Sequence, residues 1–208
     1  MGIRKMSTWK VLLHNLAARN IEAFVAKDES EARERILNLI PSDATVGFGN
    51  SQTLKKLGLA EALAERGNAV YDKTAARSPE EARALKRQSL LADWFVAGIN
   101  ALSEEGHIVN IDHSGNRVAG MLYGPDHVVL VAGRNKVVPK LEEAIQRARE
   151  VAAPQNAKRA GLHPPCLEAG HCVDCRSADR VCNSLVVIEG QIDPERMKVI
   201  IIDEDLGF

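Results

Sequence analysis

The fold is decided by the stretch from Ala97 to Lys136, AGINALSEEGHIVNIDHSGNRVAGMLYGPDHVVLVAGRNK. In this stretch a buried strand runs into an acidic turn, a polar loop and a second buried strand. Polar residues fall where strands should end, from Asn100 to the final Arg134-Asn135-Lys136. In an open α/β sheet, ligands bind in the crevice beyond the carboxyl ends of the strands. The stretch therefore predicts the ligand-facing edge of a sheet, with a small-molecule pocket.

Length and composition fix the broad class of protein. The 208 residues are 45% hydrophobic and 4% aromatic, so the chain can bury a sizeable core built mostly of Ala, Val, Leu and Ile. The formal net charge of −1 argues against nucleic acid as a partner, because nucleic-acid surfaces concentrate Lys and Arg. The chain has no run of about twenty apolar residues and no signal-peptide stretch at its start, so we expect a cytoplasmic protein without membrane insertion.

Helical and strand patterns alternate along most of the chain. Helices are expected over residues 7–19, with Ser7 as N-cap, and over 28–40, 51–57, 59–66, 78–91, 117–123 and 139–151. Strands are expected over residues 21–26, 44–48, 69–71, 94–98, 108–111 and 127–132. This alternation predicts one α/β domain over residues 1–208, with a mostly parallel open sheet flanked by helices.

The last quarter of the chain has a different character. Residues 153–183 contain several prolines and all four cysteines without a long periodic run, which predicts a Cys-rich loop that departs from the domain. Two β-rich runs follow, over 183–189 and 197–203, joined through Gly190 and Pro194. We expect them to pair as a C-terminal β-hairpin at the edge of the sheet.

A glycine-rich loop follows the strand expected at 44–48. Its glycines would let backbone N–H groups approach a ligand, and a helix beginning at Ser51 would aim its positive end at an anion, an effect of about 0.3–1 kcal/mol. The alternative is that the glycines only permit a tight turn, with Ser51 as the helix cap. The loop matches neither the dinucleotide fingerprint nor the P-loop. Its candidate ligand-binding residues are Gly47, Gly49, Asn50, Ser51 and Thr53.

A second group of polar side chains lies between Asn100 and Arg117. Carboxylates, amides and a guanidinium that converge at strand ends would suit a hydroxy acid or a sugar phosphate, and Arg117 would grip a carboxylate through paired donors. The alternative is that the acidic residues are solvated or cap the next helix. The candidate binding residues are Asn100, Asn110, Asn116 and Arg117.

Two cations, Arg134 and Lys136, follow the buried strand at 127–132. At the same sheet edge as the glycine loop, they would form an anion site. The alternative is that they are solvated loop charges.

The four cysteines have the spacing Cys166-x5-Cys172-x2-Cys175-x6-Cys182. Four thiolates satisfy the ligand count of a tetrahedral zinc ion or an iron–sulfur cluster. The spacing matches neither a zinc ribbon nor a bacterial ferredoxin run, so it does not choose between the two metals. Free cysteines, a redox disulfide or a loop staple without metal are the alternatives.

Several separated motifs carry a family resemblance. They are VGFGNSQT from Val46, NALSEEGHIVNIDHSGNRVAG from Asn100, GRNK from Gly133, APQNAKR from Ala153 and PPCLEAGHCVDCRSADRVCN up to Asn183. Together, and in this order, they resemble the lactate-utilisation (LUD-domain) family, formerly a family of unknown function. The resemblance covers essentially the whole chain.

The resemblance implies a fold and a cellular context. The fold would be related to ribose-5-phosphate isomerase, glucosamine-6-phosphate deaminase and CoA transferases, with a Gly-Ser/Thr loop facing the substrate. The context would be bacterial oxidation of L-lactate beside iron–sulfur protein partners. Exposed helical faces in a fold of this type are compatible with a homodimer.

Two functional hypotheses follow. In the first, the chain is a subunit or accessory factor of lactate oxidation, which binds a small carboxylate and carries an iron–sulfur cluster or zinc on its cysteines. In the second, it is a sugar-phosphate isomerase-like or CoA-transferase-like enzyme that binds phosphate. Enzymes of that superfamily carry an acidic group at the strand end where this chain has Asn100, an amide that cannot shuttle a proton. Asp112 is the remaining carboxylate that could act in catalysis.

Overall fold

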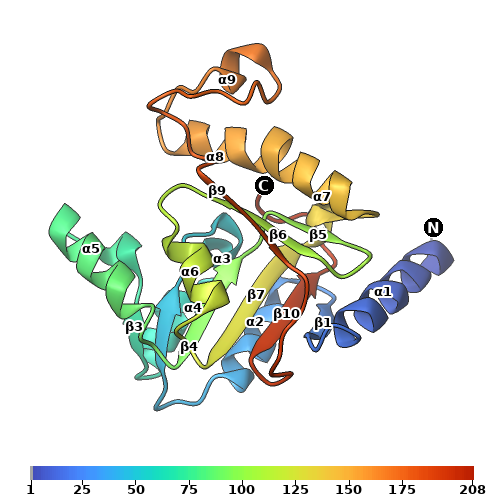
Figure 1. The fold of residues 1–208 in the computed structure, drawn as a ribbon. Coiled ribbons are helices and arrows are strands. Elements are labelled where there is room, and N and C mark those ends of the chain that lie inside the picture. Colours follow the sequence, from blue (N-terminus) through green and yellow to red (C-terminus); the bar gives the residue numbers. More distant parts are fainter. Residues whose placement is uncertain (1) are drawn as a thin grey trace.

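The main sheet is built of six parallel strands in the order β1-β10-β7-β4-β2-β3 (Figure 1). We describe it from a computed structural model, which covers residues 2–208, with side chains from Trp9 onward. The strands are β1 (Glu22–Ala26), β2 (Thr45–Phe48), β3 (Ala69–Tyr71), β4 (Trp94–Gly98), β7 (His127–Gly133) and β10 (Met197–Ile202). The predicted mostly parallel α/β fold is confirmed.

Helices cover both faces of this sheet. They are α1 (Gly2–Ala17), α2 (Glu29–Leu39), α3 (Gln52–Lys56), α4 (Leu59–Glu65), α5 (Pro79–Gln88) and α6 (Asn116–Leu122), with a short 3₁₀ turn, η1 (Lys73–Ala75), before α5. Because α1 already begins at Gly2, Ser7 lies inside the helix and the expected N-cap position is wrong. No helix in the described part of the chain has the length and apolar character that a membrane span requires.

The central strands bury both of their faces, which explains their continuous apolar sequence. In β4, Trp94 and Val96 pack with α2, α3 and α4, whereas Phe95 and Ala97 pack on the opposite face with α1 and α6. Strands β7 and β10 divide their side chains between the same two clusters. Alternation of side chains along a strand sends successive residues to opposite faces, so the sheet becomes the middle layer of three.

A second, four-stranded sheet in the order β8-β5-β6-β9 stands beside the main sheet. Its strands are β5 (Ala101–Ser103), β6 (Ile108–Asp112), β8 (Val137–Val138) and β9 (Ser184–Ile188). Only β6 and β9 are expected from the sequence, because β5 and β8 are too short to show a pattern. One face of this sheet shares the α1 and α6 core, and the other packs under the helix that crosses the top of Figure 1.

The sequence predicts that this helix ends at Val151, but it continues to Arg159. Helix α7 (Leu141–Arg147) continues through a π-helical segment, η3 (Ala148–Ala152), into α8 (Ala153–Arg159). Pro154 lies in the first turn of α8. A proline lacks the N–H that a regular helix would use, and the wider π turn before it absorbs that loss. The Cys-rich loop therefore begins after Arg159 and includes the short helix α9 (Cys166–Ala169).

The expected C-terminal β-hairpin is wrong. Strand β9 pairs antiparallel with β6 in the second sheet, whereas β10 lies between β1 and β7 in the main sheet. The physical reason is burial: all six residues of β10 are buried, as a central parallel strand requires, while β9 leaves most of its residues partly exposed.

Gly47 is explained by packing within this fold. A Cβ atom at Gly47 would lie 2.4 Å from the carbonyl oxygen of Ser89, at the end of α5, and 2.8 Å from its Cα. Backbone atoms cannot yield as a flexible side chain does.

We therefore expect Gly47→Ala to lower the free energy of unfolding by about 1–3 kcal/mol, because the added methyl group overpacks the junction of β2 and α5. Urea denaturation followed by circular dichroism measures this. An unchanged midpoint and slope would show that the junction tolerates a side chain.

Candidate functional site

A cavity of about 320 Å³ opens at the carboxyl ends of β2, β4, β7 and β10. Its wall contains residues that follow these strands: Asn50 after β2, Asn100 after β4, Lys136 after β7 and Gly207 after β10. The α7–α8 helix closes another side. This is the edge of a parallel sheet at which ligands characteristically bind.

The structure brings part of the predicted site to this cavity. The predicted residues that line it are Asn50, Ser51, Asn100, Asp112, Asn116, Arg117 and Lys136. The predicted residues outside its lining are Gly47, Gly49, Thr53, Asn110 and Arg134.

Gly98 lies in the cavity wall, and Gly49 packs behind it against Arg117. A Cβ at Gly98 would lie 2.3 Å from Ser51 Oγ, so the glycine lets the Ser51 hydroxyl rest against the end of β4. A Cβ at Gly49 would lie 2.9 Å from Cγ of Arg117. Ser51 caps α3, accepting from the N–H of Leu54 at 3.4 Å, and α3 has only five residues, so its dipole contributes little to any anion site.

Arg117 is a buried connector rather than an open carboxylate clamp. Its Nε donates to Asp112 Oδ2 at 3.2 Å. Its terminal nitrogens donate to the carbonyl of Gly98, the side-chain oxygen of Asn100 and the carbonyl of Ile111. Four of the five guanidinium N–H groups therefore have protein partners, and the paired donors expected for a ligand carboxylate are not free.

Asp112 lies at the other end of that ion pair. It is 8% exposed, and its Oδ1 accepts from the backbone N–H groups of Ser114 and Gly115, at 3.1 and 2.9 Å. The carboxylate thus stabilises the turn before α6 and balances the charge of Arg117. With three donors directed at it, it has few lone pairs left for a substrate.

Two asparagines tie the second sheet to this edge. Asn100 Oδ1 accepts from the backbone N–H of Ile111 at 2.7 Å, and Asn110 Oδ1 accepts from the N–H of Asn100 at 3.2 Å. Asn110 is fully buried outside the cavity lining, and its Nδ2 has no hydrogen-bond partner among the described residues.

Lys136 is a second buried cation at this edge of the sheet. It is 3% exposed, and its Nζ donates to the carbonyl of Ile99 at 3.1 Å and to Thr53 Oγ1 at 3.3 Å. Burial, and then the nearby cations Arg147 and Arg117, lower the pKa of Lys136 to about 7. No carboxylate of the described residues forms an ion pair with it.

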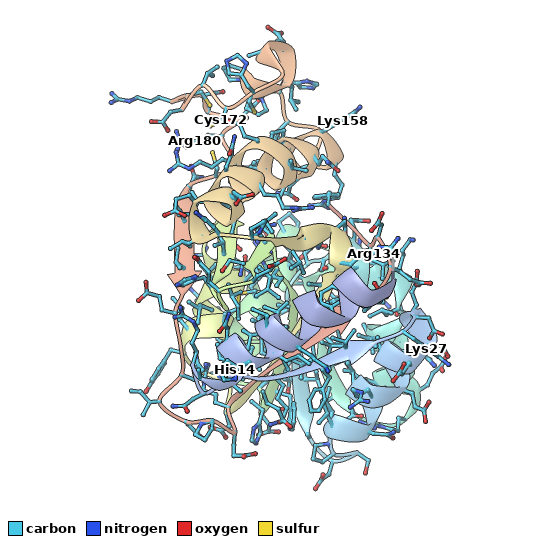
Figure 2. The ribbon with its side chains drawn as sticks, turned by 90° about the vertical axis from the view of Figure 1, so that its right-hand side faces the viewer. His14, Lys27, Arg134, Lys158, Cys172 and Arg180 are labelled. Carbon is cyan, nitrogen blue, oxygen red and sulfur yellow. The ribbon has the colours of Figure 1, made fainter. Side chains whose placement is uncertain are left out.

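Arg134 comes from the same turn as Lys136, but its side chain points to the surface. It forms ion pairs with Asp205 at 2.8 Å and Asp203 at 3.7 Å, and its side chain is 39% exposed. Figure 2 shows it at the surface. The predicted pairing of Arg134 with Lys136 in one anion site is therefore wrong.

Three cations of the cavity are missing from the sequence-based prediction: Lys73 of η1, Lys86 of α5 and Arg159 of α8. Burial and the neighbouring Lys86 lower the pKa of Lys73. Asp112 is the one acidic side chain in the lining, and Arg117 already pairs with it. Arg159 could have been found from its place in the APQNAKR motif. Lys73 and Lys86 lie in no such motif.

Asn50 adds an acceptor to this cationic cavity. Its Oδ1 is buried and has no hydrogen-bond partner in the described protein. A buried acceptor without a donor costs about 1–3 kcal/mol, and this atom is closed to solvent, so a hydrogen bond to a ligand requires a shift of the Asn50 side chain.

A family model for the LUD domain matches residues 10–202, which is most of the chain. The chain belongs to the LUD-domain family. The family's name refers to lactate utilisation.

A solved structure supports the fold of this LUD-domain chain. A DUF162 family protein from Deinococcus radiodurans is 15% identical, with a TM-score of 0.57, and the match covers 95% of this chain and 97% of that one. The delta subunit of eIF2B from Chaetomium thermophilum matches 57% of the chain and 50% of its own at 13% identity, with a TM-score of 0.37. A search of curated proteins finds no match.

The Cys-rich loop of this LUD-domain chain gathers its cysteines. Their side chains line one void of about 10 Å³, which also touches Arg180. Burial and neighbouring cysteines raise the pKa of the Cys166 and Cys182 thiols, while Arg180 opposes the shift at Cys182. Figure 2 shows Cys172 and Arg180 together beside α8. Within the described residues, however, no group of three or more metal-binding side chains converges tightly enough to hold an ion.

The void lined by the four cysteines and the ligand cavity share a wall. Ala153 and Val181 line both. One layer of side chains therefore separates the thiols from the space where a ligand would lie.

The low pKa of Lys136 predicts a dependence of stability on pH. In the unfolded chain a lysine has its ordinary pKa of about 10.4. Between pH 7 and 10 unfolding therefore takes up a proton, and the free energy of unfolding rises with pH across this window and is level below it.

Relative to a Lys136→Met variant, the LUD-domain protein should gain about 2 kcal/mol of stability between pH 7 and pH 9. Urea denaturation at both pH values measures this difference. The exposed Lys140 provides the control, since Lys140→Met should follow the unmodified protein at both. A difference that does not change with pH would show that Lys136 is fully charged in the folded state.

Proposed function

We propose that this LUD-domain protein is a lactate-utilisation factor that binds a small hydroxy acid or oxo acid in the cavity at the sheet edge. The observation that carries the proposal is the charge of the lining: it contains Lys73, Lys86, Arg117, Lys136 and Arg159 but one acidic side chain, Asp112, which forms an ion pair with Arg117. Such a cavity attracts anions and favours their binding over that of neutral molecules.

The unpaired oxygen of Asn50 favours an acid that also carries a hydroxyl group. With its side chain shifted toward the cavity, Asn50 Oδ1 would accept from the hydroxyl group of a 2-hydroxy acid, while the carboxylate of the acid would accept from the Ser51 hydroxyl and the cavity lysines. A hydrogen bond to an otherwise unpaired acceptor contributes about 1 kcal/mol.

The alternative, an isomerase-like or CoA-transferase-like enzyme, would use the same cations for phosphate. It needs a carboxylate that moves a proton or attacks substrate. Asp112 is engaged by Arg117 and two backbone N–H groups, so the geometry favours acid binding.

We further propose that the four cysteines hold an iron–sulfur cluster or a zinc ion. Donor type and number fit both, and the four cysteines line one void, although their thiols lie too far apart to hold an ion without movement of the loop. The loop would have to contract for zinc or open for a cluster, because a void of this size holds about one water-sized atom. The residues that would hold a cluster are Cys166, Cys172, Cys175 and Cys182, and a bound cluster would supply electron transfer to an iron–sulfur partner protein.

Ligand binding tests the first proposal. We expect L-lactate to bind about fivefold more tightly than propionate, which lacks the hydroxyl group, because only lactate satisfies Asn50. Lys73→Glu should weaken lactate binding about tenfold, and Lys140→Glu, outside the cavity, should leave it unchanged. Isothermal titration calorimetry measures these affinities. Equal affinity for both acids, or no binding of either, would contradict the proposal.

Metal analysis tests the second proposal. Protein purified without oxygen should contain stoichiometric metal that is lost in Cys172→Ser and kept in Arg176→Ala, whose exposed side chain is on the same loop. Iron with acid-labile sulfide and visible absorption indicates a cluster, and zinc without colour indicates a structural ion. Metal-free unmodified protein would exclude both forms.

A further inference from the structure

The amine of Lys136 is held in an orientation suited to attack. Its Nζ contacts two acceptors, the carbonyl of Ile99 and Thr53 Oγ1. The Thr53 hydroxyl itself donates to the carbonyl of Leu206 at 3.3 Å, so toward Lys136 it acts as an acceptor. Both contacts thus use N–H groups of the lysine.

A neutral amine has two N–H groups and one lone pair. In this arrangement both N–H groups are occupied, and the lone pair takes a remaining tetrahedral direction. Gly207 packs closely against this pair, because a Cβ at Gly207 would lie 2.6 Å from Thr53 Oγ1 and 3.2 Å from Nζ, so only a glycine leaves the two groups undisturbed. Lys136 is among the residues that line the cavity, so its side chain borders the space where a ligand would lie.

The surroundings favour the neutral form that nucleophilic attack requires. The charged groups that face Lys136 are Arg117 from α6 and Arg147 from α7, both cations. Each is held in place, Arg117 by the strand ends and Arg147 by the carbonyls of Asn100 and Asn135. Lysines that act as nucleophiles in other proteins are activated in the same way, by burial and by a neighbouring cation.

We propose that Lys136 forms a covalent imine with the carbonyl carbon of a 2-oxo acid held in the cavity. This inference rests on the proposed function, since it assumes that the cavity binds such acids. The lone pair of Nζ attacks the carbonyl carbon, and a proton moves from nitrogen to the former carbonyl oxygen to give a carbinolamine. The C–O bond then breaks, the hydroxyl group takes the second nitrogen proton and leaves as water, and the C=N double bond forms, with no oxidant or reductant required.

Reductive trapping tests the inference. The protein is incubated with pyruvate and sodium cyanoborohydride, which reduces the imine to a stable secondary amine, and the product is analysed by intact mass and peptide mapping. We expect one adduct per chain, on Lys136, with a rate that rises through about pH 7. Lys136→Arg, which keeps the charge but cannot form an imine, should give no adduct, whereas Lys140→Met should react like the unmodified protein.

Separate measurement of pyruvate binding, by saturation-transfer NMR with lactate as competitor, distinguishes the possible failures. If pyruvate binds and lactate displaces it but Lys136 is not modified, the imine is excluded and the proposed function stands. If neither acid binds, the proposed function fails and the imine with it. Adducts spread over surface lysines at the same rate would also overturn the inference, and mapping in the unmodified protein gives this answer even if the Lys136→Arg variant does not fold.

Discussion

The buried guanidinium of Arg117 is the interaction on which the ligand edge of this protein depends. A charge in the interior is tolerated only where a counter-ion and hydrogen bonds replace its water. Here Asp112 supplies the opposite charge, and oxygens of Gly98, Asn100 and Ile111 supply the rest. These groups belong to the ends of β4 and β6, one from each sheet. The same side chain therefore fixes the position of the second sheet against the first and closes one wall of the cavity.

Much of this architecture could be predicted from the sequence, because local patterns report local structure. The runs that became β2, β4 and β7 are apolar and bounded by turn residues, so both their existence and the polar edge beyond them follow. The neighbours of β10 could not be predicted from the sequence. An apolar run indicates that a strand is buried, but it does not indicate which strands lie beside it. The glycine loop was ambiguous for a related reason: tight packing at Gly47 and approach to a ligand require the same residue type.

The candidate site was less predictable because side-chain direction is a tertiary property. Arg134 and Lys136 are two residues apart and look equivalent in the sequence, yet the short 3₁₀ turn η2 (Arg134–Lys136) sends one to surface aspartates and the other into the interior. Lys73 and Arg159 reach the cavity from elements far from the central stretch, so only the folded chain brings them together. Arg117 was expected at the right place, but its partners within the protein could not be read from its neighbours in sequence.

The position of β10 has a consequence for how the molecule is assembled. Among the described strands, β1 pairs only with β10 in the main sheet, so the first of these strands has no neighbour until the last of them is in place. Such long-range pairing slows folding, because the entropy of closing a long loop must be lost before the contact forms. During that interval β7 is an uncovered, apolar edge, open to pairing with other chains. The burial that makes the finished sheet stable thus makes its last step the one most exposed to aggregation.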